Sequence, residues 1–231
     1  MNLSLNDFEV IYEDNHLIAV NKPAGWLVQG DQTGDTPLSE YVKEYIKIRY
    51  KKEGNVFLGV IHRLDRPVSG VVVFARTSKG LSRMNKLFQE NKVQKTYWAI
   101  TKERPAELES KLVHYLVKDN KRNLAKALDK PSKRNPNAKR SELSYNLIGS
   151  LGNFHLLEVK PKTGRPHQIR VQLARIGCSI KGDLKYGFPQ ANLDGSIHLH
   201  AKRLEFEHPV KKVPVIIEAE PPSDQVWDKF S

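Results

Sequence analysis

A single aspartate, Asp65, is the residue best placed for chemistry. It lies in the segment His-Arg-Leu-Asp-Arg-Pro-Val-Ser-Gly at 62–70, with Arg63 and Arg66 close on either side. The apolar run at 71–74 predicts a buried strand, so Asp65 is expected near a strand end, where functional sites are often built. A carboxylate between arginines can form a salt-bridged turn, or it can act as a catalytic base or nucleophile. This segment alone leaves both interpretations open.

Two further polar clusters could take part in the same chemistry. The first is Lys-Thr-Tyr-Trp-Ala at 95–99, which alternates like a strand and contains Tyr97. The second is Thr-Gly-Arg-Pro-His-Gln-Ile-Arg at 163–170, at the start of a helical pattern. Taken singly, each fits structure alone, as a strand tyrosine or a helix start with solvated arginines. Backbone N–H groups at a helix start also favour phosphate, so the second cluster fits contact with a nucleic-acid backbone.

Several common kinds of site are absent from the sequence. There is no GxxxxGK[ST] phosphate loop, no GxGxxG after a predicted strand and no CxxC pair, so nucleotide-cofactor chemistry is not expected. His198 and His200 could share one face of a strand, but a zinc site needs further ligands in place. A hydrolase triad of Ser69, His62 and Asp65 lacks the elbow that a nucleophilic serine requires. We expect neither a metal nor a cofactor.

The three clusters, in this order, resemble one family. HRLDxxxSG, KxYxA and TGRxHQIR are similar to signatures of the RluA-like RNA pseudouridine synthases. NKPAG at 21–25 and the HxH…LxFxHP stretch at 198–209 are similar to further signatures of that family. The resemblance runs from about residue 8 to residue 220. The departures from the family pattern are Pro67, Val68, Pro166 and Gln172.

The resemblance implies isomerisation of uridine in RNA to pseudouridine, in which the C1′–N1 bond breaks and the uracil is rejoined through C5. Because the base is retained, one carboxylate can serve where a glycoside hydrolase normally uses two. The family match makes Asp65 that carboxylate, acting as nucleophile or base. A buried carboxylate needs a cation, and the match makes Arg170 its partner. Tyr97 would lie by the uracil and move the proton from C5.

The same resemblance assigns further residues to substrate binding. The target base must leave its stack, and Arg63 would fill the space that it vacates. Ile169 would pack beside the uracil. His62 is also expected to bind substrate. Gly164, Arg165, His167 and Gln168 are expected to contact the RNA backbone because they lie at a predicted helix start, although turn structure alone would also account for them.

Composition fits a globular protein that binds a polyanion. The chain of 231 residues has 38 Lys plus Arg and 26 Asp plus Glu, and its formal net charge of +12 favours nucleic acid as partner. No apolar run approaches the roughly 18 residues of a membrane span, and the start lacks a signal-peptide pattern. A single cysteine, Cys178, agrees with a reducing compartment. We expect a cytoplasmic monomer whose partner is ribosomal or transfer RNA and which contacts no membrane.

The patterns predict an α+β chain, and the resemblance implies a mixed, mainly antiparallel central β-sheet with flanking helices and loops. Helices are expected after a Thr36 cap with Pro37 at the first position, after a Ser78 cap, and over 167–176. Buried strands are expected at 56–65 and 71–75.

Two segments are expected to lie outside this core. Residues 118–140 are rich in Lys and Arg and predict a basic, flexible loop that could also bind an RNA backbone. Residues 221–231 predict a peripheral tail. The sequence shows no boundary between domains, so we expect one catalytic domain over 1–231, with a core of about 8–220 and no separate N-terminal RNA-binding domain.

Two other functions stay open at this point. An RNA-binding module could keep the fold without the chemistry, although the filled positions of Asp65, Tyr97 and Arg170 argue against it. A free-nucleoside hydrolase would not account for the net charge of +12, because a neutral nucleoside gains little from a basic surface.

Overall fold

The computed structural model describes residues 7–119, 121–131 and 133–230. The chain forms two compact units, of which the first comprises Met1–Gln94 and Ala201–Pro222 and the second Lys95–His200 and Ser223–Ser231. Each unit combines antiparallel strands with helices, which confirms the predicted α+β class with a mainly antiparallel sheet. Among the described residues, no helix is long and apolar enough to cross a membrane. The single catalytic domain stays a prediction.

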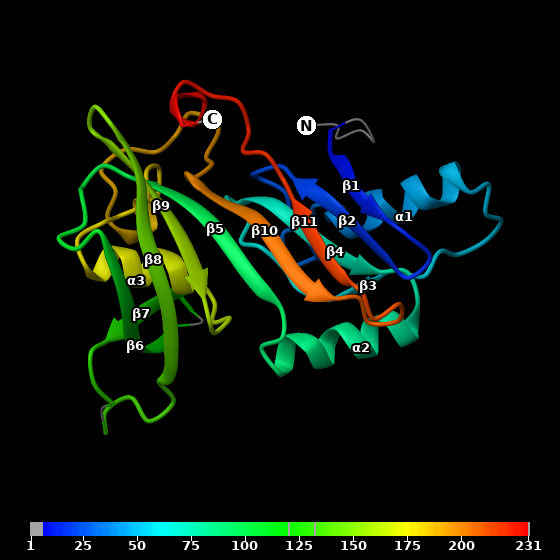
Figure 1. The fold of residues 1–231 in the computed structure, drawn as a ribbon, viewed down its shortest axis with the longest axis horizontal. Coiled ribbons are helices and arrows are strands. Elements are labelled where there is room, and N and C mark those ends of the chain that lie inside the picture. The colour runs from blue at the N-terminus through cyan, green and yellow to red at the C-terminus, as the bar shows by residue number, and fades with distance from the viewer. Residues whose placement is uncertain (1–6, 120, 132, 231) are drawn as a thin grey trace. The chain divides into compact units, whose positions relative to one another are not determined.

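The first unit is built on a sheet with a fully buried central strand. Its strands are β1 (Glu9–Glu13), β2 (Leu17–Lys22), β3 (Gly59–Val60), β4 (Ser69–Ala75), β10 (Leu199–Glu207, which begins in the second unit) and β11 (Pro214–Glu218). The order is β1-β2-β4-β10, with β11 paired to β10 and β3 to β4. All residues of β4 are buried. Helices α1 (Leu38–Arg49) and α2 (Ser78–Gln89) flank these strands (Figure 1).

Helix α1 forms because apolar residues recur on one face. Leu38, Val42 and Ile46 are buried at a spacing of four. The prediction of a Thr36 cap was wrong, since Pro37 is the N-cap and, among the described residues, no side chain caps this helix. The N–H groups of Leu38 and Ser39 instead donate to backbone carbonyls of residues 27 and 28. Partners from a neighbouring segment thus replace the side-chain cap.

Two elements on either side of residues 62–70 also differ from their predicted boundaries. The cap of α2 is Thr77 and not Ser78, because the Thr77 hydroxyl accepts the N–H of Gly80 at 3.0 Å. The strand predicted over 56–65 is regular only at Gly59–Val60. Beyond it, the N–H of Val73 donates to Nε2 of His62 at 3.0 Å, so an imidazole takes the place of a strand carbonyl.

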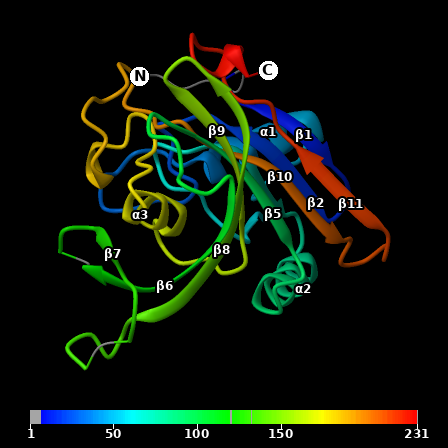
Figure 2. The same cartoon turned by 60° about the vertical axis from the view of Figure 1, so that its left-hand side comes forward.

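The second unit has a curved sheet that holds a short helix. Its strands, in spatial order, are β5 (Gln94–Thr101), β9 (Phe154–Pro161), β8 (Lys139–Leu151), β6 (Glu109–Asp119) and β7 (Leu124–Leu128). Figure 2 shows α3 (Gln168–Arg175) beside the curved strands β6 to β9. The short 3-10 helices η1 (Leu184–Tyr186) and η2 (Trp227–Lys229) complete this unit.

The prediction of an irregular loop throughout 118–140 was wrong for part of that segment. Strand β6 extends to Asp119, β8 begins at Lys139, and β7 lies between them. Strand β7 is fixed by tertiary contacts, since Ala125 packs with Val171 and Tyr186 and its N–H donates to the Tyr186 hydroxyl at 2.9 Å. The basic character of the segment did not reveal these contacts, and its contact with RNA stays a prediction.

The prediction that residues 221–231 form a peripheral tail was also wrong. Trp227 is only 3% exposed and belongs to a cluster with Ile100 and Leu156. Its ring stacks on His198 with centroids 5.3 Å apart. The segment contributes an aromatic side chain to the core of the second unit.

Candidate active site

Asp65 lies in a turn that leads directly into β4. Its carbonyl oxygen accepts the N–H of Val68 at 3.0 Å, and β4 begins at Ser69. Gly70 has φ +114°, and a Cβ at this position would lie 2.4 Å from the carbonyl oxygen of Ala201. Only glycine permits that close approach and that backbone conformation. The sequence Asp-x-x-x-Ser-Gly therefore has a structural basis, because it lets the turn enter a tightly packed central strand.

The NKPAG segment clamps this turn. Gly25 donates its N–H to the carbonyl of Arg66 at 2.8 Å, and Nε of Arg66 donates to the carbonyl of Gly25 at 2.9 Å. The side chain of Lys22 lies beneath the turn and is 0% exposed. Its Nζ donates to the carbonyls of Pro23 at 2.9 Å, Trp26 at 2.9 Å and Arg66 at 3.2 Å. Two signatures far apart in sequence thus form one local structure.

The charge of Lys22 also acts on Asp65. Burial lowers the pKa of Lys22 to about 7, while the negative charge of Asp65 acts in the opposite direction. All three hydrogen bonds of the ammonium go to backbone carbonyls. The lysine therefore supports the carboxylate through its field at longer range.

Two residues that precede Asp65 differ in their surroundings: His62 is held by contacts within the protein, and Arg63 is exposed. His62 stacks on Phe88 of α2 with ring centroids 5.1 Å apart, and its Nε2 is the acceptor for Val73. Arg63 is exposed. The first unit thus holds His62, Arg63 and Asp65 on a single segment. In this segment His62 is fixed by its contacts and Arg63 is exposed to solvent.

In the second unit, Tyr97 lies in the middle of β5. It pairs with Val159 of β9 and is half-buried. Lys95 shares its face of the strand because side chains alternate, whereas Thr96 is buried on the other face. This position presents the tyrosine on the face opposite to the buried Thr96.

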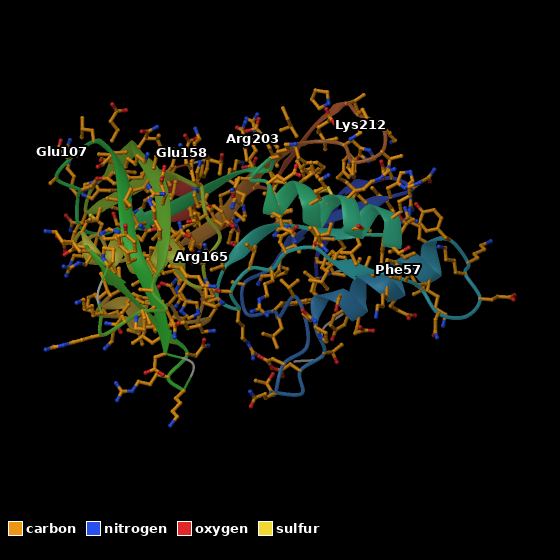
Figure 3. The ribbon with its side chains drawn as sticks, turned by 90° about the horizontal axis from the view of Figure 1, so that it is seen from below. Phe57, Glu107, Glu158, Arg165, Arg203 and Lys212 are labelled. Atoms are coloured by element: carbon orange, nitrogen blue, oxygen red, sulfur yellow. The ribbon has the colours of Figure 1, made fainter. Side chains whose placement is uncertain are left out.

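The turn that precedes α3 is held by a buried amide. The Oε1 atom of Gln168 accepts from the Thr163 hydroxyl at 2.7 Å and from the N–H of Arg165 at 3.0 Å, while Nε2 donates to the carbonyl of Glu142 at 3.0 Å. Gln168 is thereby engaged in fixing the turn to β8. Gly164 and Arg165 are exposed, and Figure 3 labels Arg165. The amide leaves the turn rigid and its arginine at the surface.

Arg170 is held by residues that sequence reasoning missed. Its Nε and Nη2 donate to the two carboxylate oxygens of Asp183 at 2.7 and 2.8 Å, and its guanidinium lies 5.1 Å from the centre of the Tyr186 ring. Arg170 is 5% exposed and Asp183 is 1% exposed. A bidentate pair of this kind fixes the plane of the guanidinium. The hydroxyl of Tyr186 also contacts Nδ1 of His167 at 2.7 Å.

Helix α3 begins at a residue with an unusual backbone conformation. His167 is the N-cap with φ 54°, a left-handed conformation, and Ile169 is 7% exposed in the first turn. The second unit thus holds Tyr97, Ile169 and Arg170, together with the turn residues. The only signal in the sequence for Asp183 is its place in Gly-Asp-Leu-Lys-Tyr-Gly at 182–187. This segment follows the helix predicted over 167–176 and carries no motif of known mechanism.

Comparison with known proteins agrees with this geometry. A model of the family described as RNA pseudouridylate synthase matches residues 16–175. The chain is 32% identical over 237 residues to tRNA pseudouridine synthase C of Vibrio cholerae, covering 95% of this chain and 92% of that protein. It is 30% identical over 233 residues to ribosomal large subunit pseudouridine synthase C of Buchnera aphidicola, covering 94% of this chain and 68% of that protein.

A solved structure is similar over nearly the whole chain. Human RNA pseudouridylate synthase domain containing 4 matches with a TM-score of 0.78 at 25% identity, covering 96% of this chain and 91% of the human one. The fold and the signature residues define an RNA-modifying isomerase. The chain belongs to the RluA-type family of RNA pseudouridine synthases, which confirms the predicted family and class of enzyme.

Proposed function

We propose that the chain isomerises a uridine of transfer RNA to pseudouridine, acting as a monomer in the cytoplasm. The observation that carries the choice of RNA is the 32% identity, over 95% of the chain, to a protein named for transfer RNA. The ribosomal relative is 30% identical and the chain covers 68% of it, so ribosomal RNA is the second candidate. The charge of +12 supports an RNA partner in either case.

Asp65 serves as the catalytic carboxylate in this proposal. It acts on the sugar or the base of a flipped uridine as the C1′–N1 bond breaks, and the C1′–C5 bond then forms. C5 loses a proton and N1 gains one, so the product is an isomer and no co-reactant is consumed. The clamped turn supports this role, because a catalytic group must be held in place.

Arg170 and Tyr97 complete the proposed catalytic set. Arg170 provides the cation that a buried carboxylate needs, and its pairing with Asp183 supports this role by fixing the guanidinium before substrate binds. Tyr97 lies beside the uracil and moves the proton from C5. Its position on β5, a strand of the sheet, supports a rigid role.

The residues predicted to bind substrate take two kinds of role. Arg63 fills the space of the flipped base, and Gly164 and Arg165 contact the RNA backbone, which their exposure permits. Ile169 packs beside the uracil. His62, His167 and Gln168 contribute by holding the binding segments in place, as their hydrogen bonds within the protein support.

The test is conversion of transfer RNA by the purified chain. Unmodified bulk transfer RNA and ribosomal RNA are incubated with the protein, and pseudouridine is mapped by a chemistry that marks it. We expect one or a few positions of transfer RNA to be converted. Conversion of ribosomal RNA alone would make ribosomal RNA the substrate in place of transfer RNA. Conversion of neither RNA would favour an RNA-binding module without catalytic activity.

The role of Asp65 is tested by Asp65→Asn. We expect the rate to fall by about 10³-fold or more, while affinity for transfer RNA is retained. Glu53→Gln is the matched control, because it removes an exposed carboxylate from the same unit. Activity of Asp65→Asn within tenfold of wild type would remove the assignment.

A further inference from the structure

Lys95 is a cation that the proposed reaction does not use. It lies on β5 two residues before Tyr97, so the two side chains leave the same face of the strand about 7 Å apart. The pairing of β5 with β9 begins at Tyr97. Lys95 therefore lies beyond the part of β5 that pairs with β9, at the end where β9 leads into the turn of Gly164 and Arg165.

The ammonium group of Lys95 lacks a counter-ion in the part of the chain that the structure describes. Among the residues that the structure describes, its Nζ makes no hydrogen bond and no ion pair. The side chain is half-buried, and burial alone lowers the pKa of its ammonium. A partly desolvated, unpaired cation is unfavourable for folding, so its position calls for a ligand that supplies negative charge.

The surroundings of Lys95 favour access by such a ligand. A Cβ built on Gly164 would lie 3.9 Å from Nζ, so the glycine keeps side-chain atoms away from the ammonium. Arg165, the next residue of the turn, is exposed and positively charged. The amide of Gln168 holds the N–H of Arg165 in place. A rigid backbone, an unpaired ammonium and an exposed guanidinium thus lie in one small region of the second unit.

We propose that Lys95 binds a backbone phosphate of the RNA substrate next to the target nucleotide, a role that rests on the proposed function. Lysine is a compact charge that binds phosphate without the fixed planar geometry of arginine. A phosphate supplies the full negative charge that the ammonium lacks, whereas a uracil carbonyl supplies only a dipole. The contact would hold the strand beside the place of Tyr97, where the flipped base is processed.

The salt dependence of RNA binding distinguishes a contact of Lys95 with a phosphate from a contact with a base. Binding of unmodified transfer RNA is measured by fluorescence anisotropy from roughly 50 to 200 mM salt for wild type, Lys95→Met and Lys95→Arg. We expect Lys95→Met to bind about tenfold more weakly at the low-salt end. Its slope of log K against log salt should fall by about 0.7 to 0.9, the value for one lost phosphate contact. Lys95→Arg should keep the slope of wild type.

Lys102→Met is the matched control. Lys102 is an exposed lysine directly after the other end of β5. Its replacement removes the same charge and should leave the slope unchanged. A thermal unfolding scan of Lys95→Met should show a melting temperature equal to or above that of wild type, since an unpaired cation is removed. If Lys95→Met fails to fold, Lys95→Gln takes its place.

An unchanged slope for Lys95→Met would overturn the proposal. A slower rate with an unchanged slope would also overturn it, because that result indicates contact with the base. The same preparations are assayed for conversion of transfer RNA. If wild type converts transfer RNA and the slopes are equal, only the role of Lys95 fails. If wild type converts none while Lys95→Met still loses slope, the proposed substrate fails and the RNA contact stands.

Discussion

The Asp65 turn of the first unit and the Arg170 segment of the second are held by opposite devices. Lys22 is fully buried beneath the Asp65 turn and donates three hydrogen bonds to backbone carbonyls. Arg170 is held by a bidentate ion pair with Asp183. In the first unit the buried Lys22 donates to the dipoles of backbone carbonyls. In the second unit the buried Arg170 is paired with the full negative charge of a carboxylate.

This difference fits the proposed roles. A carboxylate that must react cannot have its oxygens occupied by a permanent lysine contact, and the bonds of Lys22 go to the backbone instead. Arg170 has the complementary task of remaining in one orientation, which a bidentate contact secures. The turn that carries the reactive carboxylate is thus held through its backbone, whereas the side chain of the proposed partner is fixed directly.

The largest effect is expected from breaking the ion pair. Asp183→Ala leaves a buried guanidinium without its carboxylate, so we expect the free energy of unfolding to fall by about 3–5 kcal/mol. Denaturant titration measures this loss. Asp129→Ala is the control, because it breaks the ion pair between Arg175, at the end of α3, and the 61% exposed Asp129. That surface pair should contribute less than about 1 kcal/mol. Equal losses in the two variants would contradict the role of burial.

The lysine clamp is expected to have the next largest effect. Lys22→Met removes three hydrogen bonds and leaves the carbonyls of Pro23 and Trp26 without this donor, which should cost about 2–3 kcal/mol of stability. It should also slow the reaction while changing affinity for transfer RNA little, since the Asp65 turn loses its support. Lys43→Met, which breaks a surface pair with Glu40, is the control. A variant of full activity would show that the turn needs no clamp.

The parts of this arrangement that the sequence predicts are those with local signals. Leu38, Val42 and Ile46 have helical spacing, and the apolar run after Asp65 becomes the buried strand β4. The family signatures identified the candidate residues on both units because each is a contiguous segment. These features depend on neighbours in sequence, so one sequence is enough to find them.

The supporting residues depend on contacts between distant segments. Asp183 pairs with Arg170 across 13 positions, and Lys22 bonds Arg66 across 44. No local sequence pattern predicts either of these contacts. One signal was nevertheless present, because alternation places Lys22 on the same face of β2 as the buried Ile18 and Val20. A lysine at a buried position of a strand indicates a ligand or a set of acceptors for its ammonium.

The two devices should also differ in their dependence on pH. The pKa of Lys22 is about 7 in the folded chain, against an ordinary value of 10.5. Between these values the unfolded chain binds a proton that the folded chain lacks, so the contribution of Lys22 to stability rises with pH from 7 to 10.5 and falls as the pH returns to 7. The stability difference between wild type and Lys22→Met should grow by up to about 1 kcal/mol per pH unit in this window. A difference independent of pH would show that Lys22 stays charged.

The smallest effect is expected from two hydrogen bonds between neutral groups at the turn before α3. The Thr163 hydroxyl joins the N–H of Glu142, at 3.0 Å, to the amide oxygen of Gln168, at 2.7 Å. Thr163→Val keeps the shape and removes both bonds, so we expect a loss of about 1 kcal/mol that is the same at pH 7 and pH 10. Thr163→Ser should restore most of it. Because both bonds join neutral groups, a loss that varied with pH like that of Lys22→Met would contradict the distinction between charged and neutral supports.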